Sequence, residues 1–119
     1  MRIISGTARG RQLATFSGKD IRPTPDRVRE AVFSILSSRF GSFNGLKVLE
    51  LFAGSGAQAL EALSRGAKSA ILIDSGNSSA EIIADNIKRC HFEQNTRFIK
   101  QDVLPVSYTH LTLPTICSV

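Results

Sequence analysis

The sequence predicts an α/β protein built on a parallel β-sheet. Three short segments, residues 46–52, 69–74 and 96–102, have the length and the apolar, β-branched content of strands. Two segments with helical periodicity separate them, so the order from residue 46 is β-α-β-α-β. Strands that alternate with helices form parallel sheets through right-handed crossovers, which is the arrangement we expect here.

A hairpin and a helix are predicted before the sheet. Residues 2–5 and 11–15 alternate loosely around two glycines, as a short β-hairpin does. A helix then begins at Thr24, a candidate N-cap, and Pro25, which suits the first helical position, and it ends at Gly41. Its apolar residues follow the spacing of a half-buried stripe, at Val28, Ala31, Val32, Ile35 and Leu36.

Two further helices connect the predicted strands. The first extends from about Ala57 to Ser64 and stops at Gly66. The second begins with the capping box Ser78-Ser79-Ala80-Glu81. The apolar face of this second helix is expected to consist of Ala80, Ile83, Ile87 and Cys90.

Composition divides the chain into three parts. Residues 1–40 carry eight basic and three acidic side chains, and this excess equals the net charge of +5 of the whole chain. Such a basic segment favours a polyanionic partner, nucleic acid first, over a merely solvated arginine-rich arm. Residues 41–105 are the sheet-forming part. Residues 106–119 contain no Asp, Glu, Lys or Arg and show no period of a strand or helix, which indicates a separate tail.

Several protein classes are disfavoured by composition. With 42% apolar residues the chain can build one modest core. No apolar run approaches the ~20 residues of a membrane span, and the N-terminus has no signal-peptide core. Two cysteines and two isolated histidines form neither a disulfide scaffold nor a metal site. We therefore expect a soluble protein in a reducing, cytoplasmic setting, without a metal or a membrane partner.

The strongest candidate site is the segment E-L-F-A-G-S-G, Glu50 to Gly56, where a strand passes into a helix. Glycine lets the backbone approach a ligand closely, and parallel sheets bind ligands at the carboxyl ends of their strands. Asp74 ends the next strand and can accept hydrogen bonds from ribose hydroxyls. Asp102 ends the third strand and can reach an adenine amino group. Together these positions favour a nucleoside cofactor over three unrelated turns.

Two cofactors are compatible with this loop. Gly54, Gly56 and Ala59 satisfy the loose form of the dinucleotide fingerprint, so NAD stays open. Glu50 favours S-adenosylmethionine, because a carboxylate repels a pyrophosphate but attracts a sulfonium and an amino group.

The segment V-L-E-L-F-A-G-S-G-A-Q-A-L-E-A-L-S-R-G-A resembles the first motif of class I methyltransferases. More specifically, it resembles the bacterial 16S rRNA guanine-N2 methyltransferase family, ribosomal RNA small subunit methyltransferase D. Three other stretches agree in order: R-I-I-S-G-T-A-R-G-R-Q-L, I-R-P-T-P-D-R-V-R-E-A-V-F-S-I-L, and D-V-L at 102–104. The resemblance covers residues 1–104 and implies part of a Rossmann-like fold. It also implies methyl transfer from S-adenosylmethionine to a guanine exocyclic amine in 16S rRNA of the small ribosomal subunit.

The resemblance implies roles for individual residues. The methionine part of S-adenosylmethionine would lie against Glu50, Phe52, Ala53, Gly54, Ser55 and Gly56; the ribose against Asp74; and the adenine against Asp102 and the Val103 backbone. RNA phosphates would meet Arg2, Arg9, Arg11, Arg22 and Arg27. Two departures are Glu50, where aspartate is usual, and Gln58-Ala59 in place of a Leu-Gly pair.

One family motif is missing from the chain. Methyl transfer in this family depends on an (Asn/Asp)-Pro-Pro-Tyr loop that holds the exocyclic amine and stacks on the flipped base. The chain contains no Pro-Pro pair, and S-Y-T-H-L-T-L-P-T resembles translated sequencing-adapter DNA, so residues 106–119 are expected to be foreign to the family. The expected protein is an N-terminal, monomeric fragment with no catalytic residue of its own and no activity alone. The alternatives are an RNA-binding fragment without chemistry and a fragment of an NAD-dependent oxidoreductase.

Overall fold

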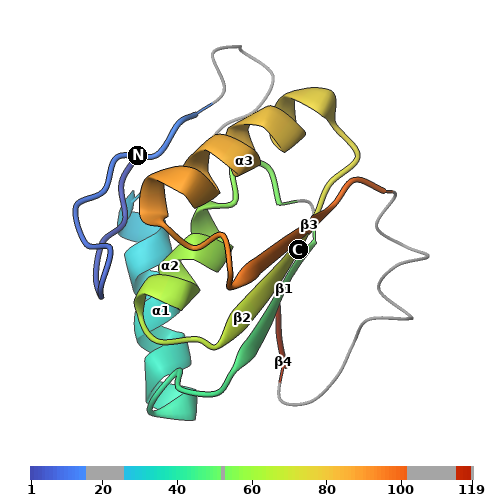
Figure 1. The fold of residues 1–119 in the computed structure, drawn as a ribbon. Helices are drawn as coiled ribbons and strands as arrows, with labels where there is room; N and C mark the ends of the chain where they lie inside the picture. Colours follow the sequence, from blue (N-terminus) through green and yellow to red (C-terminus); the bar gives the residue numbers. More distant parts are fainter. Residues whose placement is uncertain (16–25, 52, 102–114, 119) are drawn as a thin grey trace.

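A computed structural model describes residues 1–15, 26–51, 53–101 and 115–118, and it has the predicted α/β class (Figure 1). Within these residues, four parallel strands form one sheet in the order β3-β2-β1-β4, and three helices gather on one side of it. The elements in chain order are α1 (Asp26–Phe40), β1 (Lys47–Leu51), α2 (Ala57–Ser64), β2 (Ser69–Ile73), α3 (Asn77–Cys90), β3 (Thr96–Ile99) and β4 (Thr115–Ser118).

The sheet separates two apolar clusters. Successive side chains of a strand point to opposite faces, so β1 directs Val48 toward the helices and Leu49 away from them. On β2, Leu72 belongs to the helix-side core and Ile73 to the cluster on the other face. Because β1 and β2 pair in parallel from Lys47–Ser69 to Leu51–Ile73, their carboxyl ends meet at the same edge.

The predicted elements of the sheet are confirmed, with two differences. Strands β2 and β3 end earlier than expected, at Ile73 and Ile99, whereas α2 has the predicted bounds. The capping box at the start of α3 is wrong, because the helix begins at Asn77 with Gly76 as N-cap and no side-chain cap bond. The Asp74 carboxylate accepts the Gly76 N–H at 2.8 Å, so it turns the chain before Ser78 is reached.

The fourth strand was not predicted. Residues 115–118 lie in the uncharged tail, yet they pair in parallel with β1 from Lys47–Thr115 to Glu50–Ser118. A parallel ladder is made by backbone N–H and C=O groups, so it does not require an alternation of apolar and polar side chains. The edge of β1 opposite β2 is thereby paired.

Helix α1 packs through a different face from the predicted one. Val28, Val32 and Ile35 are 42–61% exposed, whereas Arg29 and Phe33 are buried. Phe33 meets Phe43 edge to face, and the Arg29 side chain forms an ion pair with Glu61 of α2. Leu36 of the predicted stripe does pack against the core, but the stripe as a whole is wrong, because the buried face has Arg29 at its centre.

The basic N-terminal segment is a hairpin, as predicted, and it is docked on the protein body. Arg2 and Gln12 form an antiparallel bridge, and the Ile3 N–H donates to the Arg11 carbonyl at 3.0 Å. Three apolar side chains of the hairpin enter the helix-side core: Ile3, Ala8 and Leu13. The turn of the hairpin lies close against the end of α2, because a Cβ on Gly6 would clash with the Ser64 carbonyl oxygen.

Glu61 of α2 holds the hairpin and α1 together. Its side chain is fully buried and accepts the backbone N–H groups of Ile4 at 2.9 Å and Ser5 at 3.1 Å. It also forms ion pairs with Arg29 at 3.5 Å and Arg65 at 2.9 Å. Arg29 in turn donates to the Arg2 carbonyl, so the same network reaches the backbone of the hairpin.

We expect Glu61→Gln to destabilise the protein by about 3–5 kcal/mol, because it removes a buried negative charge that pairs with the guanidinium groups of both Arg29 and Arg65. The free energy of unfolding, measured with urea, tests this. Glu81→Gln is the matched control, because Glu81 is exposed on α3 and its change should stay within about 0.5 kcal/mol. A loss below about 1 kcal/mol for Glu61→Gln would contradict this role.

Candidate cofactor site

The candidate site lies at the sheet edge where β1 and β2 end. The loop 53–56 connects β1 to α2, and Asp74 directly follows β2. The Asp74 carboxylate joins the two segments, since its Oδ2 accepts the Gly54 N–H at 3.1 Å while its Oδ1 accepts the Gly76 N–H at 2.8 Å. The predicted meeting of the glycine loop with Asp74 therefore occurs.

The two loop glycines have left-handed backbones. Gly54 has φ 60° and Gly56 has φ 79°, a conformation that side-chain-bearing residues seldom adopt. A Cβ on Gly56 would lie 2.9 Å from Leu72 Cδ2, with Ile83 just beyond it. Gly56 is therefore needed for close packing of the loop against β2 and α3, a reason separate from ligand approach.

Glu50 lies beneath the loop, on the helix side of β1. Its side chain is 4% exposed, and its Oε1 accepts the Ala59 N–H at 3.1 Å. Burial is the main reason that the pKa of the Glu50 carboxyl rises from 4.5 to about 8. The hydrogen bond from the Ala59 N–H lowers this pKa, and the one from the Gln58 N–H does so to a smaller extent. The negative charge of Asp74 raises it. At neutral pH the carboxyl is thus largely protonated, and a nearby cation would favour its ionised form.

Asn86 of α3 belongs to this region but was missed by sequence reasoning. Its fully buried amide donates to the Ser55 carbonyl at 2.8 Å and to the Ala14 carbonyl at 3.0 Å, and its Oδ1 accepts the Ala14 N–H. It thereby ties the loop to the N-terminal hairpin. The available signal was a polar residue inside the predicted apolar stripe, between Ile83 and Ile87.

The remaining predicted cofactor residues lie outside the described part of the chain. Phe52, Asp102 and Val103 belong to this group, and their roles stay predictions. The described loop and Asp74 still offer suitable chemistry. Each Asp74 oxygen accepts one N–H and keeps a further lone pair for a ribose hydroxyl.

Three of the predicted RNA-contacting arginines share the hairpin. Arg2 and Arg11 lie on its two arms and Arg9 lies in its turn, and all three side chains are exposed. Arg27 is also exposed but belongs to α1, and Arg22 lies outside the described residues. Arg89 of α3 lies beside the hairpin: it pairs with Asp85 and donates to the Gln12 carbonyl at 3.5 Å.

Two other kinds of site are absent from the described part of the chain. None of its helices combines the length and the apolar character needed to cross a membrane. Within the same residues, no three His, Cys, Asp or Glu side chains come together in a way that could hold a metal ion.

Comparison with curated proteins identifies relatives. Ribosomal RNA small subunit methyltransferase D of Escherichia coli K12 is 41% identical over 87 residues, covering 73% of this chain and 42% of the relative. The uncharacterized methylase RP545 of Rickettsia prowazekii is 40% identical over 116 residues, covering 92% of this chain and 48% of the relative. The chain spans about half the length of the curated relatives it matches.

Solved structures and a family model agree with these relatives. The hypothetical protein TTHA0928 of Thermus thermophilus has a TM-score of 0.77 and 33% identity, covering 92% of this chain and 61% of that one. The C-terminal domain of precorrin-6Y C5,15-methyltransferase from Rhodobacter capsulatus, at 22% identity and a TM-score of 0.63, shares the fold; the match covers 80% of this chain and 48% of that one. The resemblance found in the sequence is thus confirmed. Residues 1–112 match a single family model, and the chain belongs to the family described as conserved hypothetical protein 95.

Proposed function

We propose that this chain forms the cofactor-binding and RNA-facing part of an S-adenosylmethionine-dependent rRNA methyltransferase. The observation that carries the proposal is the joined edge of β1 and β2, where Asp74 holds the Gly54 N–H above the buried Glu50. Relatives named as rRNA small subunit methyltransferases support the substrate class. The proposed reaction moves a methyl group to a guanine exocyclic amine of 16S rRNA, in the bacterial cytoplasm.

The proposed cofactor residues have distinct tasks. The loop Ala53–Gly56, with Phe52, would hold the methionine part, and Glu50 would face its amino group. Asp74 would accept from the ribose hydroxyls, while Asp102 and the Val103 backbone would hold adenine. When bound, S-adenosylmethionine supplies a methyl group on a sulfonium. The chain's own part is to hold this cation beside two carboxyl groups.

RNA would be held by the exposed arginines of the hairpin and of α1. Arg2, Arg9, Arg11 and Arg27 can neutralise phosphates, a contribution that does not depend on sequence and weakens with salt. We add Arg22 to this set from the resemblance. The hairpin is fixed to α2 and α3, so its arginines keep a defined position relative to the cofactor loop.

The same proposal divides the chain into residues 1–40 for RNA, 41–105 for the cofactor, and 106–119 as a tail foreign to the family. Two observations run against this boundary: the family model extends seven residues into the tail, to residue 112, and β4 pairs the end of the tail with β1. Sequencing of the DNA downstream of codon 105 tests the division: a longer frame that encodes Pro-Pro-Tyr supports it.

The 119-residue chain alone is expected to transfer no methyl group to RNA, because it contains no Pro-Pro-Tyr motif to hold the guanine amine. Incubation of the purified chain with tritiated S-adenosylmethionine and small ribosomal subunits tests this. E. coli ribosomal RNA small subunit methyltransferase D is the positive control. Label in 16S rRNA with this chain as the only enzyme would contradict the proposal.

We expect calorimetry to detect binding of S-adenosylmethionine to the chain. Asp74→Asn should weaken this binding by about tenfold or more, because hydrogen bonds to a charged acceptor contribute about 1.5–3 kcal/mol. Asp85→Asn is the matched control, because the Asp85 side chain is exposed on α3 and pairs with Arg89 rather than with the loop. Heat from NAD but not from S-adenosylmethionine would favour the oxidoreductase alternative. RNA affinity without any cofactor binding would favour a simple RNA-binding fragment.

Glu50→Gln is expected to remove a pH dependence of stability. An unfolded Glu50 ionises near pH 4.5 and the folded one near pH 8, so between these values only the folded state keeps the proton. As the pH rises from about 4.5 to about 8, the free energy of unfolding should therefore fall more in the wild type than in the Glu50→Gln variant. The amide of the variant can still accept the Ala59 N–H.

Urea midpoints of both proteins at pH 5 and pH 8 measure this difference. S-adenosylmethionine affinity should rise over the upper part of the same range in the wild type only, because its cation favours the ionised carboxyl. Parallel pH profiles for the two proteins would contradict the assignment.

A further inference from the structure

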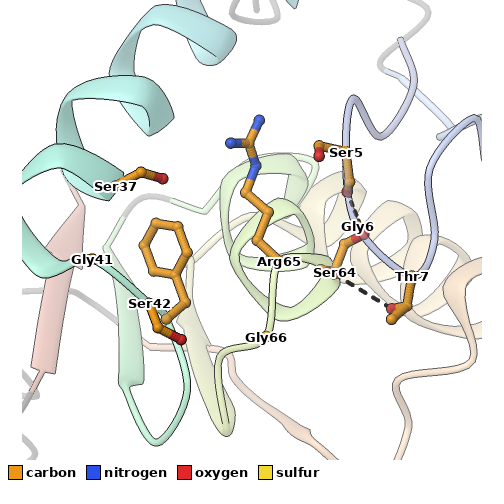
Figure 2. A pocket seen from close by; sticks show the side chains of 10 residues that line it. Ser5, Gly6, Thr7, Ser37, Gly41, Ser42, Ser64, Arg65 and Gly66 are labelled. Carbon is orange, nitrogen blue, oxygen red and sulfur yellow. Dashed lines mark hydrogen bonds between the residues drawn. The ribbon is translucent and has the colours of Figure 1, made fainter.

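A concave site lies at the other end of α2 from the cofactor loop. It is a cavity of about 580 Å³, a volume within the range of small-ligand sites, and it opens between α1, the hairpin and the end of α2 (Figure 2). Helix α2 has eight residues, which separates the two sites by roughly 12 Å at 1.5 Å per residue. The cavity is therefore distinct from the cofactor site.

The walls of this cavity are rich in hydroxyl groups. Glycines and Phe43 complete a lining whose polar side chains are Ser5, Thr7, Ser37, Ser42, Ser64 and Arg65. Figure 2 shows the Arg65 guanidinium between Ser37 of α1 on one side and Ser5 of the hairpin on the other. Small residues leave the space open, while the polar ones supply hydrogen-bond donors.

Not all of these hydroxyls are already used. The Ser64 hydroxyl donates to the Ser5 carbonyl at 2.6 Å and accepts the Ala8 N–H. The Ser42 hydroxyl accepts the Asn44 N–H at 3.1 Å, so its hydrogen is left to donate. No described residue forms a hydrogen bond with the Ser37 hydroxyl. Ser37 and Ser42 are thus positioned to donate to a ligand.

The local charge favours an anion. The Arg65 Nε donates to Glu61 Oε2 at 2.9 Å, and the guanidinium lies over the Phe33 ring at 4.9 Å, so the group is fixed in orientation. Glu61 also pairs with Arg29. Two guanidinium groups therefore share the Glu61 carboxylate, so this carboxylate is not devoted to Arg65 alone. A guanidinium with neighbouring hydroxyl donors suits the oxygens of a phosphate.

The cavity is continuous with the basic hairpin. Gly6 and Thr7 form part of its wall, and the Arg9 N–H donates to the Gly6 carbonyl at 3.2 Å, so Arg9 belongs to the same turn. An RNA strand held by the hairpin arginines would pass this turn. Its phosphodiester is consequently the oxyanion most directly presented to the cavity.

We propose that the cavity between α1, the hairpin and the end of α2 binds a backbone phosphate of the RNA substrate. The inference rests on the proposed function, because it takes RNA as the ligand of the hairpin. The same chemistry would also admit free inorganic phosphate, and the experiment separates the two.

The test compares Ser37→Asp with Ser38→Asp in the full chain. Both variants add one negative charge near the end of α1, but Ser37 lines the cavity whereas Ser38 is outside its lining and bonds the Ser34 carbonyl. Fluorescence anisotropy with a labelled single-stranded RNA of mixed sequence measures the affinity over a range of salt concentrations. Ser37→Asp should weaken binding about tenfold and reduce the salt slope by about one, and Ser38→Asp should weaken it by less than about twofold.

The outcomes separate this inference from the proposed function. Equal weakening by the two variants, with cofactor binding intact, overturns the cavity assignment and leaves the proposed function standing. Absence of RNA binding by the unmodified chain overturns the RNA contact of the proposed function and this inference with it. Phosphorus NMR with inorganic phosphate adds a second arm: phosphate binding abolished by Ser37→Asp, with RNA affinity unchanged, assigns the cavity to free phosphate and overturns the RNA assignment.

Discussion

The buried carboxylate of Glu61 is the contact on which the arrangement of the first 40 residues depends. Two backbone N–H groups of the hairpin and two guanidinium groups converge on it, one of them from α1. Burial of a carboxylate without partners is strongly unfavourable, so the folded state in which Glu61 is buried depends on these partners together. The hairpin, α1 and α2 are therefore expected to assemble together.

Helix α2 lies between the two proposed binding sites, and the hairpin contacts the protein near both of its ends. At its start, Asn86 links the Ser55 carbonyl to Ala14 of the hairpin. At its end, the Ser64 carbonyl accepts the Thr7 N–H at 2.8 Å. A cofactor loop and an RNA-facing surface on one short helix keep a constant relative position, which methyl transfer between two ligands requires.

Two buried carboxyl groups of this protein differ in their partners. Glu61 has ion pairs with two arginines, whereas Glu50, among the described residues, has backbone N–H groups but no basic side chain beside it. Burial therefore acts on Glu50 with little opposition and raises its pKa to about 8. The first group serves assembly of the fold, and the second is poised to respond to a bound cation.

The sequence by itself determined the α/β class, the bounds of α2 and the meeting of Gly54 with Asp74, because these follow from local patterns and from parallel strands ending at one edge. It did not predict β4, whose pairing is made by the backbone, or the buried face of α1, which centres on Arg29. The roles of Glu61 and Asn86 were also out of reach, because all of their named partners except Arg65 lie 31 to 72 residues away in the chain. Tertiary structure alone decided these contacts, since the cost of burying a polar group depends on partners that only the folded chain brings near.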